Sequence, residues 1–484
     1  MKLSPVFATL SLLTLATLPV IEAAQTPRDS KDGNQSKRKK AATQETDAKK
    51  SAKKGAPAAP ETRSTRKPVV YEEYDLANGM HVILHPNHAV PVVSTYVLYK
   101  VGSKNERPDR TGFAHFFEHL MFEGSEYIPR GTIDKYISGA GGNLNASTSF
   151  DQTDYYFNLP SNQLRLALWI ESERLLHPRI DETGVETQRA VVKEERRRSY
   201  DNQPYGSLFE ELSSLVFEGT PYQWVPIGSF QYIDQASIEE FRAFHKSFYL
   251  PENATLVVAG DFDPAETRKL IGEYFDDIPR GAAIPRPDFA WKFDVGGKSK
   301  DVERKNTPLP ALVHAWRAPS ETDADAYPLE MLSHILASGR SSRLYQSLVE
   351  KKGLAMSAVP YCYLLERAGV FALSVTGQAG VSLEELDAVL KEEIATVVKN
   401  GVTEEELQKA RNAMEAQFAE SGGTMHERAS ALAHYHVFYG DTALINTELE
   451  RYLAVTRADL QRVASRYLND KGRYTLRFPV PSAK

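Results

Sequence analysis

Hydrophobic and polar positions follow two different periods along the chain from residue 68 onwards, and together they predict strands interspersed with helices. Alternation with a period of two, or a short run that is apolar throughout, predicts a strand, whereas apolar residues that recur every three or four positions predict a helix. The expected strands are Val69–Tyr74, Met80–His85, Val92–Val101, a hairpin within Asn143–Asn158, Ala254–Gly260, Ala311–Trp316 and Gly369–Thr376. The expected helices are Thr111–Phe122, Thr132–Ser138, Asn162–Leu176, Asp181–Arg198, 207–217, Ser237–Phe248, Pro264–Phe275, Ala326–Leu336, Ser341–Leu348, Leu383–Lys399 and Thr403–Ala419.

The order of these elements occurs twice, before and after the Pro- and Gly-rich stretch Pro279–Pro287. With an offset of roughly 214–222 residues, Phe113–His119 falls on Tyr327–Ser333, and Asp181–Glu195 falls on Thr403–Gln417. The second copy keeps the helices but lacks the histidines of the first. We therefore predict an α+β chain that contains a duplicated unit, of which one copy carries the chemistry.

Composition separates the N-terminal region from the rest of the chain. A charged start at Lys2, an apolar run over Val6–Ile21 and the small residue Ala23 predict a secretory signal peptide and export across the inner membrane to the periplasm. The segment that follows has few large apolar side chains, so it cannot bury enough surface to fold. No later apolar stretch reaches the length of a membrane span, and we expect no stable membrane insertion. The predicted divisions are a signal peptide at 1–23, a disordered basic linker at 24–67, an N-terminal domain at 68–278, a linker at 279–292 and a homologous C-terminal domain at 293–484.

Charge and cysteine content narrow the classes of function. Residues 25–67 carry 13 Lys and Arg against 5 Asp and Glu, so the remaining chain has a net charge of −14 within the total of −6. A net negative charge on this part of the chain disfavours nucleic acid as a partner. The one cysteine, Cys362, excludes an intrachain disulfide, and its apolar neighbours predict a small buried side chain. A metal ion would therefore bind His and carboxylate groups rather than thiolates.

The strongest chemical signal is the motif His115-x-x-Glu118-His119. On an α-helix, residues i, i+3 and i+4 lie on one face, so the three side chains can reach one point. Two imidazoles four residues apart form half of a zinc site, and a carboxylate beside them can take a proton from a water molecule that the metal activates. The order is the inverse of the H-E-x-x-H motif of other zinc proteases. The alternative is a surface helix with two solvated histidines.

A catalytic zinc ion needs three protein ligands and leaves one position for water. Glu118 is unsuitable as the third ligand, because a ligated carboxylate is a poor proton acceptor. The helix that contains Arg189–Arg198 is the better source, since Glu194 and Glu195 follow two valines within it. Periodicity does not say which of the two glutamates turns inward. The histidines that are weaker candidates are His81, His85, His88, His434 and His436.

Three segments together resemble the pitrilysin–insulinase family of zinc peptidases, in the smaller two-unit group that includes mitochondrial processing peptidase. They are the His115–His119 motif, Asn145-Ala-Ser-Thr…Thr153-Asp-Tyr-Tyr and Arg189-Ala-Val-Val-Lys-Glu-Glu, and the resemblance covers roughly residues 69–480. It implies two α/β-sandwich domains in tandem, each with an antiparallel-dominated sheet and helices on one side. Two such pairs would enclose a chamber.

The resemblance also implies how the metal is held. In this family the metal-binding glutamate follows the second histidine by about 76 residues, which places it at Glu195 and leaves Glu194 pointing elsewhere. One Zn²⁺ per chain would then bind His115, His119 and Glu195. Glu118 would be the general base of an endopeptidase that hydrolyses peptides or unfolded segments.

Substrate contacts and one departure from the family pattern follow from the same resemblance. Asn145 and Ala146 match the edge strand on which a substrate is expected to bind as an added β-strand. Seven residues before the metal glutamate the family usually carries a Glu that supports the ligands, and here this position is Gln188. An amide can still orient a ligand by hydrogen bonding, but it brings no charge, so we expect an altered metal affinity.

A second departure concerns partners. Active members often carry an Arg and a Tyr, seven residues apart, that hold the substrate and stabilise the tetrahedral intermediate; here Val349 and Met356 occupy these places. Neither side chain donates a hydrogen bond, and such a donor is worth about 2.7–4 kcal/mol. We therefore expect a heterodimer with a zinc-free homologous subunit that supplies the pair, with a homodimer as the alternative. The rival function is a non-catalytic architectural or peptide-binding subunit of the same fold.

Overall fold

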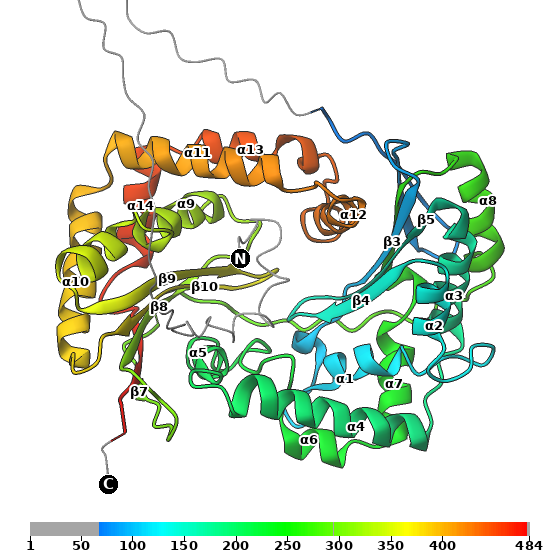
Figure 1. The fold of residues 1–484 in the computed structure, drawn as a ribbon, viewed down its shortest axis with the longest axis horizontal. Coiled ribbons are helices and arrows are strands. Elements are labelled where there is room, and N and C mark those ends of the chain that lie inside the picture. Colours follow the sequence, from blue (N-terminus) through cyan, green and yellow to red (C-terminus); the bar gives the residue numbers. More distant parts are fainter. Residues whose placement is uncertain (1–66, 294, 482–484) are drawn as a thin grey trace, which may run out of the picture. The chain divides into compact units, whose positions relative to one another are not determined.

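The computed structural model describes residues 67–293 and 295–481. The predicted signal peptide and, apart from Lys67, the predicted basic linker lie outside these residues. None of the described helices combines the length and apolar character that crossing a membrane requires. The described chain contains two β-sheets, one from each half of the sequence (Figure 1).

The first sheet has six strands in the order β1-β2-β6-β3-β5-β4. β2 and β6 run parallel, and the other neighbouring pairs run antiparallel. Valine and tyrosine dominate β3 in the centre of the sheet, where residues of this kind pack well on a pleated surface. The strands are β1 Glu72–Asp75, β2 His81–Pro86, β3 Val92–Tyr99, β4 Asn143–Thr148, β5 Thr153–Pro160 and β6 Ala254–Gly260.

The second sheet has five strands in the order β7-β11-β8-β10-β9. β7 and β11 run parallel, and the other neighbours run antiparallel. β9 contains Pro360, which a strand tolerates at the edge of a sheet, and this proline obscured the strand in the sequence pattern. The strands are β7 Ser299–Asp301, β8 Ala311–Ala318, β9 Ala355–Leu364, β10 Gly369–Gly377 and β11 Tyr474–Phe478.

The two sheets share one topology. Without β1, the strands of each sheet, numbered in chain order, occupy the spatial order 1-5-2-4-3, and the first and last strands form the parallel pair. α1 and α9 follow the second strand of each half, and α4 and α11 follow the fourth. Asp181 and Thr403 cap α4 and α11 through their side chains. This confirms the prediction of two homologous α+β domains in tandem.

Most of the expected helices are present, with small differences at their ends. The helix expected at Ser341–Leu348 is a π-helical segment at Tyr345–Lys351 instead, and β7, β9, β11, α6 and α12–α14 were not predicted. The helices are α1 Phe113–Leu120, α2 Ile133–Gly139, α3 Leu164–Leu176, α4 Glu182–Arg196, α5 Leu208–Val216, α6 Phe230–Gln235, α7 Ile238–Phe248, α8 Pro264–Phe275, α9 Ala326–Ala337, α10 Leu383–Asn400, α11 Glu404–Glu420, α12 Met425–His434, α13 Leu444–Leu453 and α14 Arg457–Tyr467.

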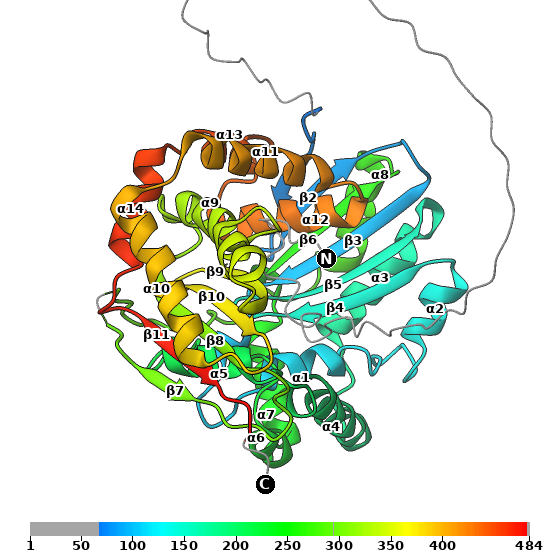
Figure 2. The same cartoon turned by 60° about the vertical axis from the view of Figure 1, so that its left-hand side comes forward.

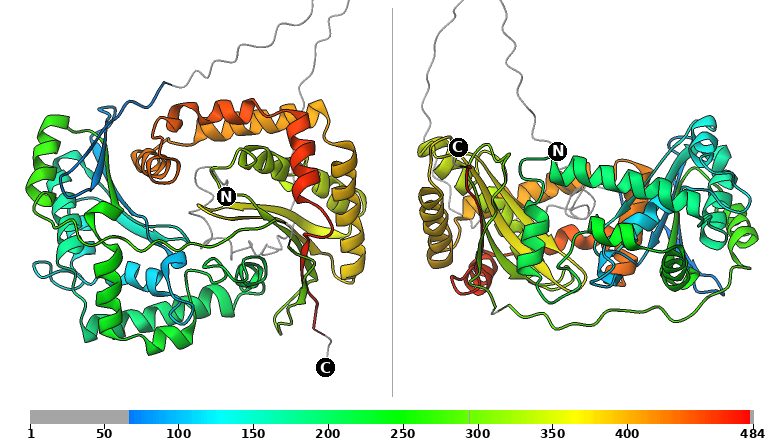
Figure 3. Two further views of the ribbon diagram at one scale, coloured as in Figure 1. Left: turned by 180° about the vertical axis from the view of Figure 1, so that it is seen from behind. Right: turned by 90° about the horizontal axis from the view of Figure 1, so that it is seen from below.

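Each half covers one face of its own sheet and also sends a helix to the other half. α3 and α8 lie on one side of the first sheet and α12 on the other (Figures 1 and 2). In β2, Val82 and Leu84 lie in the core on the first side, whereas Ile83 packs with residues of α12. α9, α10 and α14 lie on one side of the second sheet, and α5 lies on the other (Figure 3). In β8, Leu312 packs with the first group of helices, whereas Val313 lies in the core to which α5 contributes. This exchange of α5 and α12 joins residues 68–293 and 295–481 into one compact unit.

A buried ionic network also links the halves. Lys104 is 2% exposed, and its Nζ lies 2.6 Å from Asp151 Oδ1 and in contact with Glu366. Lys100 Nζ lies 2.7 Å from the other oxygen of Glu366, and the backbone N–H of Glu366 donates to Asp151 Oδ2 at 3.0 Å. Asp151 lies in the turn between β4 and β5, so the network fixes this turn against the turn between β9 and β10.

The charge of Glu366 should therefore stabilise the fold in a pH-dependent way. Burial opposes the charged form, but Lys104 and Lys100 lower the pKa of Glu366 to about 2 from its ordinary 4.5. A depressed pKa contributes stability above the ordinary value, and this contribution is lost as the pH falls from about 4.5 towards 2. We expect Glu366→Gln to lower the free energy of unfolding by about 3 kcal/mol at pH 7 and by progressively less below about pH 4.5. Urea denaturation across this range checks the prediction, and a difference that does not change with pH contradicts it.

Candidate metal centre

A buried carboxyl group fixes the start of α1, the helix that carries the histidine motif. Before the helix, Gly112 has a φ of 97°, a conformation that glycine adopts at little cost. Glu106 Oε2 accepts a hydrogen bond from the Gly112 N–H at 3.0 Å, and its Oε1 accepts one from the Ala114 N–H at 2.8 Å. Burial raises the pKa of Glu106 to about 8. The side chain thus satisfies N–H groups that a helix start leaves without partners.

Aromatic residues hold the opposite face of α1 against α7. The rings of Phe113 and Phe116 stack on Phe241 at centroid distances of 4.8 and 4.5 Å. Phe117 contacts Tyr249 at 4.6 Å. Because these side chains are buried, α1 has a single rotational setting, in which its histidines face α4.

His115 and His119 of α1 and Glu195 of α4 meet at one point. The distances are 3.3 Å between the two Nε2 atoms, 3.5 Å from His115 Nε2 to Glu195 Oε2 and 3.4 Å from His119 Nε2 to Glu195 Oε2. Ligands of a tetrahedral zinc ion with bonds of about 2.0–2.1 Å lie about 3.3–3.4 Å apart. The three atoms therefore fit a zinc ion both in chemistry and in spacing.

The register of α4 decides which of the two adjacent glutamates faces the histidines. Val185, Gln188, Val192 and Glu195 recur at intervals of three and four residues, so they form one face of the helix. The two valines are buried in the core. Glu194 lies off this face, and 70% of its side chain is exposed. The structure thus brings Glu195 to the histidines and leaves Glu194 in solvent.

The surroundings of His115 and Glu195 favour the protonation states that bind metal ions. Burial and the neighbouring His119 lower the pKa of His115 to about 4, so its imidazole is neutral near pH 7. Burial opposes the charge of Glu195, but the two histidines lower its pKa overall. His119 Nδ1 lies 3.2 Å from Gln188 Oε1. Because this oxygen only accepts, His119 Nδ1 is the donor, and Nε2 is the nitrogen that can bind a metal once it is deprotonated. Burial opposes the charge of His119, but Glu195 and Glu118 raise its pKa overall.

Glu118, the expected base, is outside the ligand group and has a different partner. Its Oε2 accepts a hydrogen bond from Thr148 Oγ1 at 2.6 Å. Burial raises the pKa of Glu118 to about 7, which suits a group that takes and returns a proton near neutral pH. Thr148 is the last residue of β4, so this strand positions the carboxylate.

The residues expected to bind substrate lie on the same strand. β4 is at the edge of the first sheet and pairs with β5 on one side. Asn145 is exposed and Ala146 is half-buried. An open strand edge presents backbone N–H and C=O groups to which an extended peptide can bind.

Two of the residues that act at this site had no prediction from the sequence. Thr148 belongs to the segment Asn145-Ala-Ser-Thr, so its proximity to the site could have been inferred, although its hydrogen bond to Glu118 could not. Glu106 gives no periodic signal, because it reaches α1 from an irregular loop.

The five histidines that were weaker ligand candidates all have other contacts. The rings of His81 and His436 stack face to face with a centroid distance of 3.4 Å, beside Glu73. The lone pairs of stacked rings lie in two parallel planes, so they do not converge on one ion. Each of the other three has a ring nitrogen close to an oxygen atom. His85 Nδ1 lies 2.6 Å from the carbonyl oxygen of Val70, His88 Nδ1 lies 2.6 Å from Asp261 Oδ1, and His434 Nε2 lies 3.0 Å from Glu321 Oε2.

Three residues of the second half were singled out by the sequence. Val349 is half-buried against the second core, and Met356 on β9 is 55% exposed. Neither side chain can donate a hydrogen bond to a substrate. Cys362 is half-buried rather than fully buried, and burial raises the pKa of its thiol.

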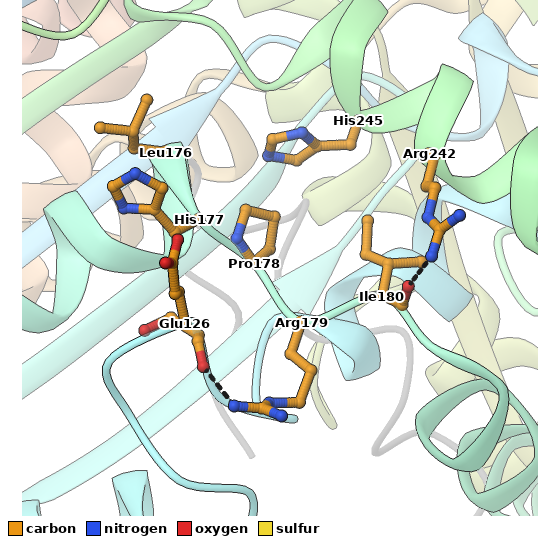
Figure 4. A pocket seen from close by; sticks show the side chains of 9 residues that line it. Glu126, Leu176, His177, Pro178, Arg179, Ile180, Arg242 and His245 are labelled. Carbon is orange, nitrogen blue, oxygen red and sulfur yellow. Dashed lines mark hydrogen bonds between the residues drawn. The ribbon is translucent and has the colours of Figure 1, made fainter.

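A pocket of about 530 Å³ lies beside the end of α3 and the start of α4 (Figure 4). Within it, Arg242 donates to the carbonyl of Ile180 at 2.8 Å. None of the three metal-centre ligands lines it, so this pocket is separate from the metal centre. The lining residues are Ser125, Glu126, Leu176, His177, Pro178, Arg179, Ile180, Arg242 and His245.

Two family models match the chain. Residues 81–224 match the insulinase model of peptidase family M16, and residues 235–414 match the model named peptidase M16 inactive domain. The first of these segments contains the complete ligand set described above. The second segment contains most of the second sheet and none of the metal-centre ligands.

Several relatives and solved structures agree with these matches. A Helicobacter pylori protein named zinc protease PqqE is 30% identical over 403 residues, which cover 83% of this chain and 90% of the relative. The beta subunit of mitochondrial-processing peptidase from Blastocladiella emersonii is 27% identical, with 82% and 86% covered. The crystal structure of a protease from Helicobacter pylori has a TM-score of 0.81 at 29% identity and covers 86% of this chain and all of its own. The periplasmic protease PqqL from Escherichia coli shares the fold, with a TM-score of 0.72 at 19% identity over 87% of this chain and 48% of its own. With its ligand set, its duplicated fold and these relatives, the chain belongs to the insulinase family, peptidase family M16.

Proposed function

We propose that this protein is a zinc-dependent endopeptidase in which His115, His119 and Glu195 hold one Zn²⁺ and Glu118 is the general base. The observation that carries the proposal is the triangle of ligand atoms with sides of 3.3–3.5 Å. Relatives named zinc proteases support the choice of metal and of reaction.

The residues around the metal centre have different roles in peptide hydrolysis. When bound, zinc acts as a Lewis acid that polarises the scissile carbonyl and makes water a nucleophile near neutral pH. Glu118 accepts the proton of the attacking water and returns it to the leaving amine, so that no net proton is consumed. Thr148 holds the Glu118 carboxylate in place through its hydroxyl. Gln188 holds the His119 ring so that Nε2 faces the other two ligands, His115 and Glu195.

The open edge of β4 supports an extended peptide as substrate. A peptide that adds to this edge beside Asn145 and Ala146 would run along the strand that ends at Thr148 and so pass close to Glu118. Backbone hydrogen bonding of this kind requires an unfolded segment. We therefore propose peptides and unfolded segments as the substrate class.

Val349 and Met356 support a requirement for a partner. At the positions where related peptidases carry an Arg and a Tyr, these side chains offer no donor to an oxyanion. We propose a zinc-free homologous subunit that supplies the pair, and a homodimer is the alternative. The similarity to one subunit of mitochondrial-processing peptidase agrees with a two-subunit enzyme. The fold shared with a protease named periplasmic supports a periplasmic location.

Hydrolysis of a quenched fluorescent peptide library tests the function and the partner together. The chain would be assayed alone, with a neighbouring homologue that carries the Arg and Tyr, and as Glu118→Gln with that homologue. We expect hydrolysis by the mixture at a rate at least tenfold above that of the chain alone. Equal rates would contradict the heterodimer and favour the homodimer. A zinc-loaded mixture that hydrolyses nothing would favour the architectural or peptide-binding subunit.

A further inference from the structure

A chain of polar groups, with the buried Glu123 at its centre, extends outwards from the metal ligand His119. Gln188 Nε2 donates to Glu123 Oε1 at 2.6 Å. Glu123 Oε2 lies 2.7 Å from Arg130 Nε, and the other end of Arg130 contacts Asp181, the residue that caps α4. Glu123 is 5% exposed, so its carboxylate depends on these partners.

The donors and acceptors in this chain can be assigned without ambiguity. Glu123, paired with Arg130, is a carboxylate that only accepts, so the NH₂ group of Gln188 must face it. The oxygen of Gln188 then faces His119, which must donate from Nδ1. As a result, His119 Nε2 is the ring nitrogen that points towards His115 and Glu195. His115 Nδ1, in contrast, is buried without a hydrogen-bond partner among the described residues.

We propose that Glu123 is a positioning residue for the metal centre and that its charge requires an amide at position 188. The inference rests on the proposed zinc site. Glu123 orients His119 through Gln188, and through Arg130 and Asp181 it ties the segment after α1 to the start of α4. The two helices that carry the ligands are thereby held in register. The negative charge that supports His119 is therefore on Glu123, which contacts Gln188 and not the histidine itself.

A reciprocal pair of substitutions tests this arrangement. In Gln188→Glu, a second carboxylate faces Glu123 at contact distance and no N–H joins them, so we expect zinc affinity to fall by about 10–100-fold. In the double variant Glu123→Gln with Gln188→Glu, the new amide can donate to the new carboxylate, which still accepts from His119 Nδ1. We expect the double variant to recover zinc affinity to within a few-fold of the wild type. Competition with a chromophoric zinc chelator at pH 7 measures each affinity.

Matched controls separate this role from a general effect on folding. Glu194→Gln changes an exposed carboxylate on the same helix, and we expect it to leave zinc affinity unchanged. Thermal unfolding of the metal-free proteins shows whether each variant is folded. A Gln188→Glu protein that binds zinc as tightly as the wild type, or a double variant no better than the single one, overturns the role of Glu123. A folded wild type that binds no zinc overturns the proposed function itself.

Discussion

Replacing Glu118 with Gln should lower the rate of peptide hydrolysis by about 10²–10⁴-fold while zinc stays bound. Gln has nearly the same shape and can still accept the hydrogen bond from Thr148 Oγ1 through its amide oxygen. It cannot take a proton from water or return one to an amine. Since Glu118 is not one of the three grouped ligands, the metal content should stay at that of the wild type.

The measurement is the rate on the quenched peptide library, together with zinc analysis of the same samples. Glu194→Gln, which alters an exposed glutamate, is the matched control and should retain full activity. Hydrolysis by Glu118→Gln within a few-fold of the wild-type rate would show that another group takes the proton. Loss of zinc from this variant would show that Glu118 supports the ion rather than the reaction.

Replacing Glu195 with Ala should remove the metal. Two neutral imidazoles would remain, and zinc would lose both its third ligand and the one negative charge in the set. We expect the loss of affinity to exceed the 10–100-fold that is typical when a supporting partner of a ligand is removed. Hydrolysis should fall to background in the same samples.

Glu194→Ala distinguishes a ligand from a general effect of charge on α4. The two glutamates are adjacent, but Glu194 is largely exposed and pairs with Arg197, 3.4 Å away. Zinc analysis after dialysis should find one ion per chain in Glu194→Ala and almost none in Glu195→Ala. The assignment fails if both variants keep their zinc or if both lose it.

Much of the fold was accessible from the sequence because its signals are local. Apolar spacing predicted the strands and helices of the first half closely; β6 and α8, for example, have the expected ends. The repeated order of elements predicted the duplication, which the shared strand order confirms. The pattern missed β7, β9, β11 and the helices after α11. β7 is very short, so it gives little signal. β9 contains a proline, which argues against a strand in the sequence and is tolerated here because β9 lies at the edge of its sheet.

The sequence did not predict that α5 and α12 each pack on the sheet of the other half. Each helix has an apolar face, and the sequence shows that this face must be covered. It does not show by which sheet, because either sheet offers an apolar face of the same kind. The structure places α12 on the first sheet and α5 on the second.

For the metal centre, the sequence by itself determined the chemistry of the groups and the half of the site that one helix carries. His115, Glu118 and His119 share a face because the turn of a helix is a local property. The periodicity of the sequence left Glu194 and Glu195 as alternatives, and the family resemblance favoured Glu195; the tertiary structure brings Glu195 to the histidines. Only the tertiary structure showed that Gln188 is joined to Glu123. These contacts connect segments far apart in the chain. They depend on how the buried faces of α1 and α4 pack, which no short stretch of sequence encodes.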